Sequence, residues 1–347
     1  MTFQPSVATS PPTLPDSTPP LPPISAETPA AKAGPSNLRL RVIWGVIGAA
    51  LLLGSVWFSP WTFGLFFAVV QAIMLWEFYR MMRAGGYAPA TWLGVGASLL
   101  LFAVIHAWQG LPQYWHAQAN NTYVKIGNAS VAIGSGASPE QHMVVVAWAL
   151  AGIAAILLVL FLILVLREIF LWPSSPSPFV NVAITVGGIF YISIPISLLQ
   201  VIAYNQSYSS DLPHYDYRRI FALLFLIWAS DIGAYAVGRA IGKHKFAPSI
   251  SPGKTWEGWA GGFVMTLVVG WAIGYMLPDM PLTHRLVAAG VVAVFAPLGD
   301  LAESMLKRSV GVKDSGSIMP GHGGLLDRFD AFLLVLPVLA LLQLLVG

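Results

Sequence analysis

Cysteine is absent from the 347-residue sequence, which excludes disulfides, thiolate metal ligands and cysteine nucleophiles. Any bound metal must therefore be held by oxygen or imidazole groups. Charged residues are also scarce, at 10% of the chain, compared with about 25% in a typical soluble domain. In their place, 56% of the residues are hydrophobic and the mean hydropathy is +0.70. This balance indicates a chain that lies in a lipid bilayer.

The first 37 residues contain no apolar run, and they lack the basic start and apolar core of a cleavable signal peptide. They are rich in proline, serine, threonine and alanine, so they cannot bury enough surface to offset the chain entropy lost on folding. We predict a disordered tail over residues 1–37. A simple extension is favoured over a docking segment.

Nine apolar runs follow the tail, each near the roughly 17–25 residues that cross a bilayer as a helix. They lie near residues 40–58, 61–79, 90–108, 143–166, 180–203, 219–241, 257–277, 285–306 and 329–346. The first two are joined so tightly at Ser59-Pro60 that they must form a helical hairpin. The eighth is the least regular, because Pro297 and Asp300 interrupt it. The sequence thus predicts an all-α integral membrane protein with about nine transmembrane helices and cytoplasmic polar loops.

Positive charge is distributed unevenly between the two ends of these helices. If the N-terminus lies inside the cell, 14 of the 18 basic residues fall on the inner side: Lys32, Arg39, Arg41, Arg80, Arg83, Arg167, Arg239, Lys243, Lys245, Lys254, Lys307, Arg308, Lys313 and Arg328. Because basic residues accumulate in cytoplasmic loops, this orientation is preferred. It puts segments 242–256 and 307–327 on one cytoplasmic face and the polar loop 109–142 outside. We expect the protein in the inner, or cytoplasmic, membrane.

The most polar stretch of the chain begins in the eighth apolar run. Asp300, Glu303, Ser304, Lys307 and Arg308 share one face of a helix, because they recur every three or four residues. An acid within a membrane helix costs about 2.5–3.5 kcal/mol to insert, and two acids one turn apart repel unless a cation lies between them. An ion pair between Lys307 and Glu303 is the structural alternative, but it leaves Asp300 unexplained. The pattern favours a functional site.

A glycine-rich turn precedes the last apolar run. The segment 320–324, Pro-Gly-His-Gly-Gly, lets the backbone approach a ligand closely and leaves N–H groups free. Asp327 and Asp330 follow at the start of the final helix, where one acid could simply be an N-terminal cap. A turn of His-Gly-Gly followed by two acids and Arg328 is more than a cap requires, so the pattern favours a functional site. No second histidine lies nearby in the sequence, so His322 is expected to bind phosphate or orient the turn rather than to ligate zinc.

Lys254 belongs to a third motif, which runs from Ser251 to Gly258. It contains the Gly-Lys-Thr of a phosphate-binding P-loop, but Pro248 stands where that motif needs glycine, and no strand is expected before it. A lysine, hydroxyl groups and backbone amides just before a helix still suit an anion. Equally, Glu257 could balance the charge of Lys254 in a loop without a ligand. The residues leave these two interpretations open.

A fourth group lies inside the apolar run 219–241, where Asp231, Tyr235 and Arg239 recur one turn apart. An unpaired carboxylate is avoided in a membrane, so Asp231 should meet Arg239, a lysine from another helix or a metal, and Tyr235 could donate to it. A structural hydrogen bond between helices is the alternative.

Two further acids stand beside arginines near predicted helix ends: Glu77 near Arg80, and Glu168 beside Arg167. We interpret both as membrane-interface anchors. The 13 tryptophans are interpreted as interfacial belt residues rather than stacking platforms, and nucleic acid is not an expected partner.

Together these motifs resemble those of the phosphatidate cytidylyltransferases, also called CDP-diacylglycerol synthases. The resemblance covers residues 220–335, and its fixed positions are Asp231, Gly233, Ala234, Tyr235, Gly238, Arg239, Ser251, Lys254, Gly258, Ser304, Lys307, Arg308, Lys313, Asp314, Pro320, His322, Gly323, Gly324, Asp327, Arg328 and Asp330. The chain departs from the usual pattern at Ile232, Gly253, Met319 and Ala331. At Gly253 the usual lysine is missing, which removes one cation from the expected phosphate loop.

The resemblance implies transfer of CMP from CTP to phosphatidic acid, with release of pyrophosphate. Because Mg²⁺ binds carboxylates and keeps positions open for phosphate oxygens, we expect it to be held by Asp300 and Asp327, with Glu303 and Asp231 as further ligands and a second cation, such as K⁺, able to share the site. Lys307 and Arg308 join the two aspartates as catalytic residues. The expected substrate-binding residues are Ser251, Lys254, Ser304, Lys313, Asp314, His322, Gly323, Gly324, Arg328, Asp330, Tyr235 and Arg239. The domains are then N-terminal transmembrane helices over 38–215 and a catalytic transmembrane region over 216–347.

Other functions remain open at this point. An ion-coupled transporter would also carry buried acids, although no internal repeat is evident and the polar groups gather on one face. A CDP-alcohol phosphotransferase would need an Asp-Gly-x-x-Ala-Arg run, which the sequence lacks. A cytidylyltransferase acting on another lipid phosphate would share the same motifs. The sequence does not decide whether the chain forms a homodimer.

Overall fold

The computed structural model describes residues 35–116, 123–126, 129–132, 139–175, 177–206, 213–318 and 323–346. Helices dominate this part of the chain: α1 (Pro35–Phe58), α2 (Pro60–Ala84), α3 (Thr91–His116), α4 (Pro139–Leu171), α5 (Pro178–Gly188), α6 (Ile194–Ala203), α7 (Tyr217–Ile241), α8 (Trp256–Ala272), α9 (Leu282–Ser309) and α10 (Leu326–Val346). A π-helical turn, Ile189–Ser193, joins α5 to α6, and a 3₁₀ turn, Ile273–Tyr275, extends α8. Each of the nine predicted apolar runs is thus helical. The predicted tail lies almost wholly outside the described residues.

Apolar side chains cover much of the outside of this bundle. Seven helical spans in the described residues are long and apolar enough to cross a membrane, and α1 adds the shorter apolar segment Val42–Phe58. In α4 the apolar window within Leu150–Leu171 is only 11% buried, so most of its side chains face outward. Lipid shields such a surface from water, and a helix satisfies its own backbone hydrogen bonds there. The protein is a multi-pass membrane protein.

The described strands form three short antiparallel hairpins: β1 (Tyr123–Ile126) with β2 (Ala129–Ala132), β3 (Tyr204–Gln206) with β4 (Pro213–Tyr215), and β5 (Lys245–Ala247) with β6 (Ser251–Thr255). The third hairpin corrects the expectation that no strand lies near the Gly-Lys-Thr motif. In its register Lys245 pairs with Thr255 and Ala247 with Ser251. Lys254 is therefore carried on a strand rather than on an irregular loop.

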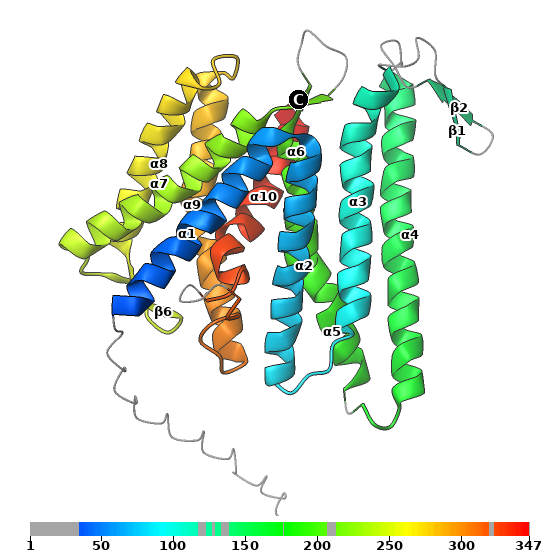
Figure 1. The fold of residues 1–347 in the computed structure, drawn as a ribbon, viewed down its shortest axis with the longest axis horizontal. Coiled ribbons are helices and arrows are strands. Elements are labelled where there is room, and N and C mark those ends of the chain that lie inside the picture. Colours follow the sequence, from blue (N-terminus) through cyan, green and yellow to red (C-terminus); the bar gives the residue numbers. More distant parts are fainter. Residues whose placement is uncertain are drawn as a thin grey trace, which may run out of the picture.

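The helices are arranged in two groups. In Figure 1, α2, α3 and α4 stand side by side on one side of the molecule, and α7, α8 and α9 lie together on the other. α10 lies between them and packs on α9 and α6. The β5–β6 hairpin and the segment that joins α9 to α10 are at the same end of the bundle (Figure 1), as predicted for residues 242–256 and 307–327.

Small residues bring α7 and α8 into backbone contact. The residues at this contact are Gly233, Ala234, Gly238, Gly258, Gly261 and Gly262. Small residues are common between membrane helices, because the helices associate there through close van der Waals packing. The contact fixes Asp231 on α7 relative to β6, which leads directly into α8.

Pro297 does not interrupt α9, which is a continuous helix of 28 residues. Proline has no N–H, so the carbonyl of Ala293 loses its usual helical donor. The indole N–H of Trp259, on α8, donates to that carbonyl at 3.1 Å. The irregular eighth run is therefore a complete helix whose unpaired carbonyl is satisfied by a neighbour.

Candidate active site

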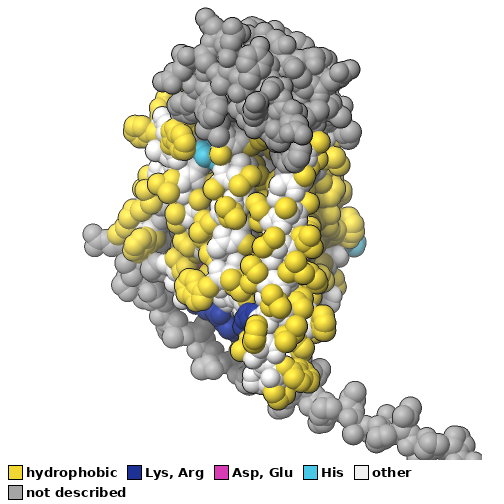
Figure 2. Space-filling model, turned by 90° about the vertical axis from the view of Figure 1, so that its right-hand side faces the viewer, with side chains coloured by type: hydrophobic (Ala, Val, Ile, Leu, Met, Phe, Trp, Pro, Cys, Tyr) yellow, Lys and Arg dark blue, Asp and Glu magenta, His cyan; other side chains and the backbone are white. Residues whose placement is uncertain are grey.

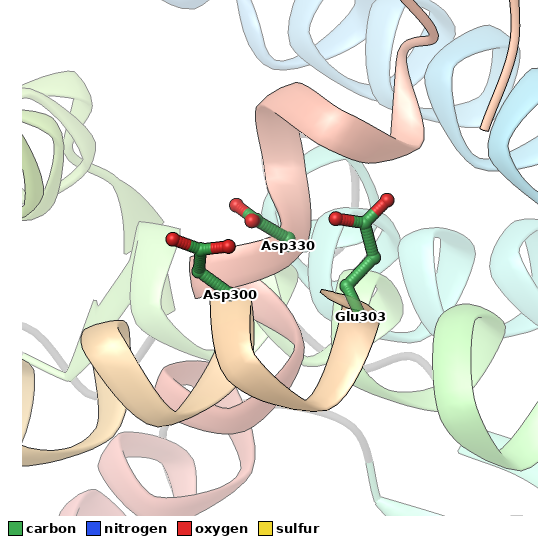
Figure 3. A group of neighbouring side chains, drawn as sticks. All are labelled: Asp300, Glu303 and Asp330. Atoms are coloured by element: carbon green, nitrogen blue, oxygen red, sulfur yellow. The ribbon is translucent and has the colours of Figure 1, made fainter. Parts of the chain in front are cut away.

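Three carboxylates from two helices converge where α9 and α10 pack together. Asp300 and Glu303 belong to α9 and Asp330 to α10, and one oxygen of each lies within 4.8 Å of the others. Figure 3 shows Asp300 and Asp330 next to each other across the two helices, with Glu303 on the other side of Asp330. Glu303 is 1% exposed, and the two aspartates are half-buried. We call these three residues the acidic cluster.

Asp330 reaches the acidic cluster because α9 and α10 touch backbone to backbone at Gly299. A Cβ atom at residue 299 would lie 2.6 Å from the carbonyl oxygen of Asp330 and 3.0 Å from the Cα of Ala331. Real Cβ atoms do not make contacts as short as the first of these, so any side chain here would push α10 away. Glycine at 299 therefore sets the separation between Asp300 and Asp330.

Strand β6 brings a cation to the acidic cluster. The Nζ of Lys254 lies 2.6 Å from Oδ2 of Asp300 and donates to the carbonyl oxygen of Pro297 at 3.1 Å. Asp231, on α7, interacts electrostatically with Asp300 and Lys254. Within the described residues Asp231 forms no ion pair or hydrogen bond with Arg239 or with a lysine, so its expected partner stays a prediction.

Glu257 does not pair with Lys254, so that part of the ligand-free interpretation of the third motif is wrong. Its carboxylate accepts hydrogen bonds from the backbone N–H groups of Lys243 and His244 and pairs with Nδ1 of His244 at 2.5 Å. Glu257, in the first turn of α8, thereby joins the end of the β5–β6 hairpin to the residues just before β5. Lys254 is left to pair with Asp300.

Lys307 bridges two acids from different helices. Its Nζ lies 2.8 Å from Oε2 of Glu303 and 2.6 Å from Oδ1 of Asp327, and its side chain is 12% exposed. The ion pair expected between Lys307 and Glu303 is confirmed. Because Asp327 shares the same ammonium group, Lys307 also fixes the start of α10 against the end of α9.

Asp327 is largely engaged in holding the turn that precedes α10. Its Oδ2 accepts from the N–H of Gly324 at 2.8 Å, from the N–H of Ser315 at 3.2 Å and from the hydroxyl of Ser315 at 3.0 Å. These contacts hold the segment before the helix in place and are not those of an N-terminal cap, which would accept from N–H groups in the first turn of α10. Asp330, which we expected to bind substrate, is the residue of α10 that lies in the acidic cluster. Direct metal ligation by Asp327 stays a prediction.

Two buried acids of the N-terminal helices were misinterpreted from the sequence. Glu77 on α2 is 0% exposed, and its Oε2 accepts from the N–H of Leu326 at 2.9 Å and from the hydroxyl of Ser315 at 3.3 Å. Glu168 is 4% exposed and accepts from the hydroxyl of Ser175 at 2.7 Å. Neither is a membrane-interface anchor. Glu77 joins α2 to the first residue of α10, and no local sequence pattern signals this, because the two partners are 249 positions apart.

The acidic cluster has the donors and the charge that suit a divalent metal. Oε1 of Glu303 is buried and has no hydrogen-bond partner among the described residues, whereas buried polar atoms are normally satisfied. The acids around it outnumber the lysines, since Asp231, Asp300, Glu303, Asp327 and Asp330 gather near Lys254 and Lys307. Carboxylate oxygens with positions left for water or phosphate are what Mg²⁺ prefers. These residues fit Mg²⁺, and Asp300, Glu303 and Asp330 are the side chains close enough together to hold it.

Comparison with known proteins identifies the family of the chain. The sequence model of the cytidylyltransferase family matches residues 39–346. The chain belongs to the cytidylyltransferase family. Family membership confirms the resemblance found in the motifs, and the match extends well beyond residues 220–335.

Among the relatives of this cytidylyltransferase family member are three bacterial proteins named phosphatidate cytidylyltransferase. The one from Bacillus subtilis (strain 168) is 49% identical over 131 residues, which are 37% of this chain and 48% of the relative. The protein from Staphylococcus saprophyticus is 48% identical over 35% of this chain and 47% of its own length. The protein from Staphylococcus haemolyticus is 46% identical over 38% of this chain and 50% of its own length. The chain thus spans about half the length of the curated relatives it matches.

Other substrate-binding residues predicted for this chain lie beside the acidic cluster or on the surface. The hydroxyl of Ser304 donates to Oδ1 of Asp300 at 3.2 Å, and Ser251 is half-buried in β6. The exposed residues are Arg308, Lys313, Asp314 and Arg328, all within or beside the segment that joins α9 to α10. This segment concentrates positive charge at the end of the bundle that carries the hairpin.

Two further predictions concern α7 and the glycine-rich turn. Tyr235 and Arg239 are both exposed, and the guanidinium of Arg239 donates to the hydroxyl of Tyr235 at 2.8 Å. Gly323 has a φ of +82°, which favours glycine, and the N–H of Gly324 donates to Asp327. His322 lies outside the described residues, so its role stays a prediction.

Proposed function

We propose that this protein transfers the CMP group of CTP to phosphatidic acid and so produces CDP-diacylglycerol and pyrophosphate. The observation that carries the proposal is the acidic cluster, with Lys254 and Lys307 on either side of it inside a bundle of apolar helices. Membership of the cytidylyltransferase family and the names of the bacterial relatives support the same activity.

The reaction needs charge neutralisation more than it needs proton transfer. A phosphate oxygen of the lipid attacks the α-phosphorus of CTP, and the bond from that phosphorus to the oxygen of the β-phosphate breaks. The electron pair of that bond leaves with pyrophosphate. The second pKa of a phosphate monoester is about 6, so the lipid phosphate is largely ionised at neutral pH and requires no general base. The obstacle is repulsion between two anions.

The carboxylates of the acidic cluster would hold Mg²⁺, with Asp231 and Asp327 as further predicted ligands. When bound, Mg²⁺ would stabilise negative charge on the reacting phosphate oxygens, a role that a second cation such as K⁺ could share. The carboxylates lie on two helices in direct backbone contact at Gly299. Their spacing is therefore fixed before the substrates arrive, which lowers the entropy lost on reaching the reactive geometry.

Lys254 and Lys307 would bind phosphate oxygens next to this centre. Each ammonium group already pairs with a carboxylate, Lys254 with Asp300 and Lys307 with Glu303. An ammonium group has three donors, so each lysine can keep a carboxylate partner and still donate to a phosphate. The exposed basic residues Arg308, Lys313 and Arg328 would attract the triphosphate to the same end of the bundle.

The lipid substrate would approach from the side of the bundle. On α7, Asp231 is exposed, Ile232 is 60% exposed and Tyr235 is 67% exposed. An exposed carboxylate is costly against lipid tails, and it is tolerated where polar groups pass. A lipid phosphate could thus reach Lys254 past Asp231 while its acyl chains stay between the helices and the bilayer.

We also infer that the N-terminus and both polar segments face the cytoplasm, where CTP and free Mg²⁺ are found, and that the membrane is the inner one. Because the natural chain has no cysteine, single cysteines can report this orientation without background. Gly311→Cys should react with a membrane-impermeant maleimide only after intact cells are made permeable. Asp279→Cys, at the other end of the bundle, should react once the reagent reaches the outer surface of that membrane. The reverse pattern would overturn the orientation.

The activity is tested with purified protein, phosphatidic acid and each of CTP, dCTP, UTP and ATP. Release of pyrophosphate and a CMP-containing lipid are measured together, with and without Mg²⁺. We expect product with cytidine nucleotides and Mg²⁺. Product with a different lipid phosphate but not with phosphatidic acid would assign another lipid substrate. No product with any lipid, combined with ion flux in proteoliposomes, would favour the transporter instead.

A further inference from the structure

A second polar site lies far from the acidic cluster in the sequence, at the end of the bundle where α2 meets α3 and α4. It is a pocket of about 270 Å³ lined by the first turn of α3 and by two arginines, Arg83 of α2 and Arg167 of α4. None of its lining residues belongs to the acidic cluster or to the residues predicted to bind substrate. The proposed function therefore leaves this pocket unexplained.

The pocket carries an excess of positive charge. The guanidinium of Arg83 donates to the hydroxyl of Thr91 at 2.6 Å, and within the described residues Arg83 is in no ion pair. Arg167 does pair with Glu168, but that carboxylate also accepts from the hydroxyl of Ser175 at 2.7 Å. One full positive charge thus faces the pocket without a carboxylate partner.

The surroundings of the pocket are apolar. Figure 2 shows a small group of Lys and Arg side chains in a hollow near the lower end of a face that is otherwise hydrophobic, with no acidic side chain in view on its described part. Trp92, which lines the pocket, is 80% exposed, and at the end of α4 that carries Arg167, Phe170 is 84% exposed and Trp172, just after the helix, is 64% exposed. Exposed tryptophans mark the level of lipid headgroups, and arginines at that level bind lipid phosphates.

The size of the pocket restricts the ligand. Pockets for drug-sized ligands are roughly 300–1,000 Å³, so this pocket suits a compact group rather than a nucleotide. An arginine fork matches the geometry of a phosphate. The backbone N–H groups of Ala90 and Thr91 already donate to the Thr185 hydroxyl and to the Pro89 carbonyl, so the arginines are the donors that the pocket offers to a phosphate.

We propose that the pocket between Arg83, Arg167 and the start of α3 binds the phosphate of an anionic membrane lipid. The two arginines hold the phosphate, and the acyl chains lie along the exposed apolar side chains of α4. The lipid is a bound partner and not a substrate. It joins α4, whose apolar window is only 11% buried, to α2 and α3.

Native mass spectrometry of the full chain in mild detergent tests this proposal. Phosphatidylglycerol is the probe, because it is anionic but has no phosphate monoester for the proposed reaction. Phosphatidylcholine and inorganic phosphate are the comparison ligands. We expect the protein to retain phosphatidylglycerol, and Arg83→Gln to weaken that binding about tenfold or more, since a hydrogen bond to a charged group is lost.

Two variants separate this effect from misfolding. Arg83→Lys keeps the charge and should bind phosphatidylglycerol better than Arg83→Gln. Arg285→Gln removes an arginine at the start of α9, away from the pocket, and should leave lipid binding unchanged. Equal phosphatidylglycerol binding by Arg83→Gln and the natural protein would overturn the proposal. Competition by inorganic phosphate as strong as that by the lipid would overturn the assignment to a lipid.

Discussion

Gly299 on α9 lies in backbone contact with Asp330 on α10, and this contact brings the third carboxylate into the acidic cluster. A Cβ atom at residue 299 would lie only 2.6 Å from the carbonyl oxygen of Asp330, so no side chain fits there. The spacing of the carboxylates is therefore a property of helix packing and not of the acidic side chains alone. A change in that packing should alter activity without removing any charged group.

Substitution of Gly299 by alanine tests this relationship. A methyl group at 299 must displace α10, and overpacking of this kind costs about 1–3 kcal/mol. We expect Gly299→Ala to lower the thermal stability in detergent and to raise the Mg²⁺ concentration needed for half-maximal product formation. Gly290→Ala is the matched control on the same helix, because a Cβ there meets nothing within 4 Å. If Gly299→Ala and Gly290→Ala needed the same Mg²⁺ concentration, the α9–α10 contact would not control metal binding.

Neutralising one carboxylate of the acidic cluster should remove activity while the protein still folds. Asp300→Asn and Asp330→Asn each take one negative oxygen donor from the cluster. We expect the rate of CMP-lipid formation to fall by about 100-fold or more, the scale of losing one electrostatic contact to the transition state. Asp279→Asn, an exposed acid in the α8–α9 connection, should retain full activity. Radiolabelled CTP incorporation measures all three.

Asp327→Asn distinguishes the observed role of Asp327 from the predicted one. If Asp327 chiefly holds the turn before α10, asparagine keeps an acceptor for the Gly324 N–H and the Mg²⁺ requirement changes little. If Asp327 ligates the metal, the requirement rises as it does for Asp330→Asn. Mg²⁺ titrations of the two variants side by side decide between these roles, because the residues lie in the same turn of α10.

The sequence was sufficient to predict the membrane helices and to single out Asp300, Glu303 and Asp330 as site residues, because both predictions depend on local chemistry. An apolar run of suitable length becomes a helix in a membrane, and an acid inside one is costly enough to stand out. The choice between Asp327 and Asp330 depends on how α10 is rotated against α9, which neither residue encodes alone. The pairing of Lys254 with Asp300 depends on the β5–β6 hairpin, and the role of Glu77 depends on a partner near the other end of the chain. Those features needed the tertiary structure.

Glu77 should act as a positioning residue for α10. Glu77→Ala leaves the Leu326 N–H without its buried acceptor, whereas the Ser315 hydroxyl keeps Asp327, and an unsatisfied buried group costs about 1–3 kcal/mol. Glu77→Gln keeps an oxygen acceptor for the same N–H. We expect kcat to fall in Glu77→Ala with little change in the KM for CTP, and we expect Glu77→Gln to recover most of it. Equal losses in both variants would show that the negative charge matters rather than the acceptor.

Lys307 should contribute to stability and to activity together, because it is shared by Glu303 and Asp327. Lys307→Met leaves the buried carboxylate of Glu303 and the half-buried carboxylate of Asp327 without their cation, and breaking a buried ion pair costs about 3–5 kcal/mol. A variant that also carries Glu303→Gln removes one of the stranded charges, so it should recover part of the stability. It should not recover activity, because the acidic cluster then lacks a carboxylate and the phosphate loses its ammonium donor. Thermal unfolding in detergent and CMP-lipid formation, measured on the same samples, separate the two effects. Recovery of activity along with stability in the double variant would mean that Lys307 acts only on folding.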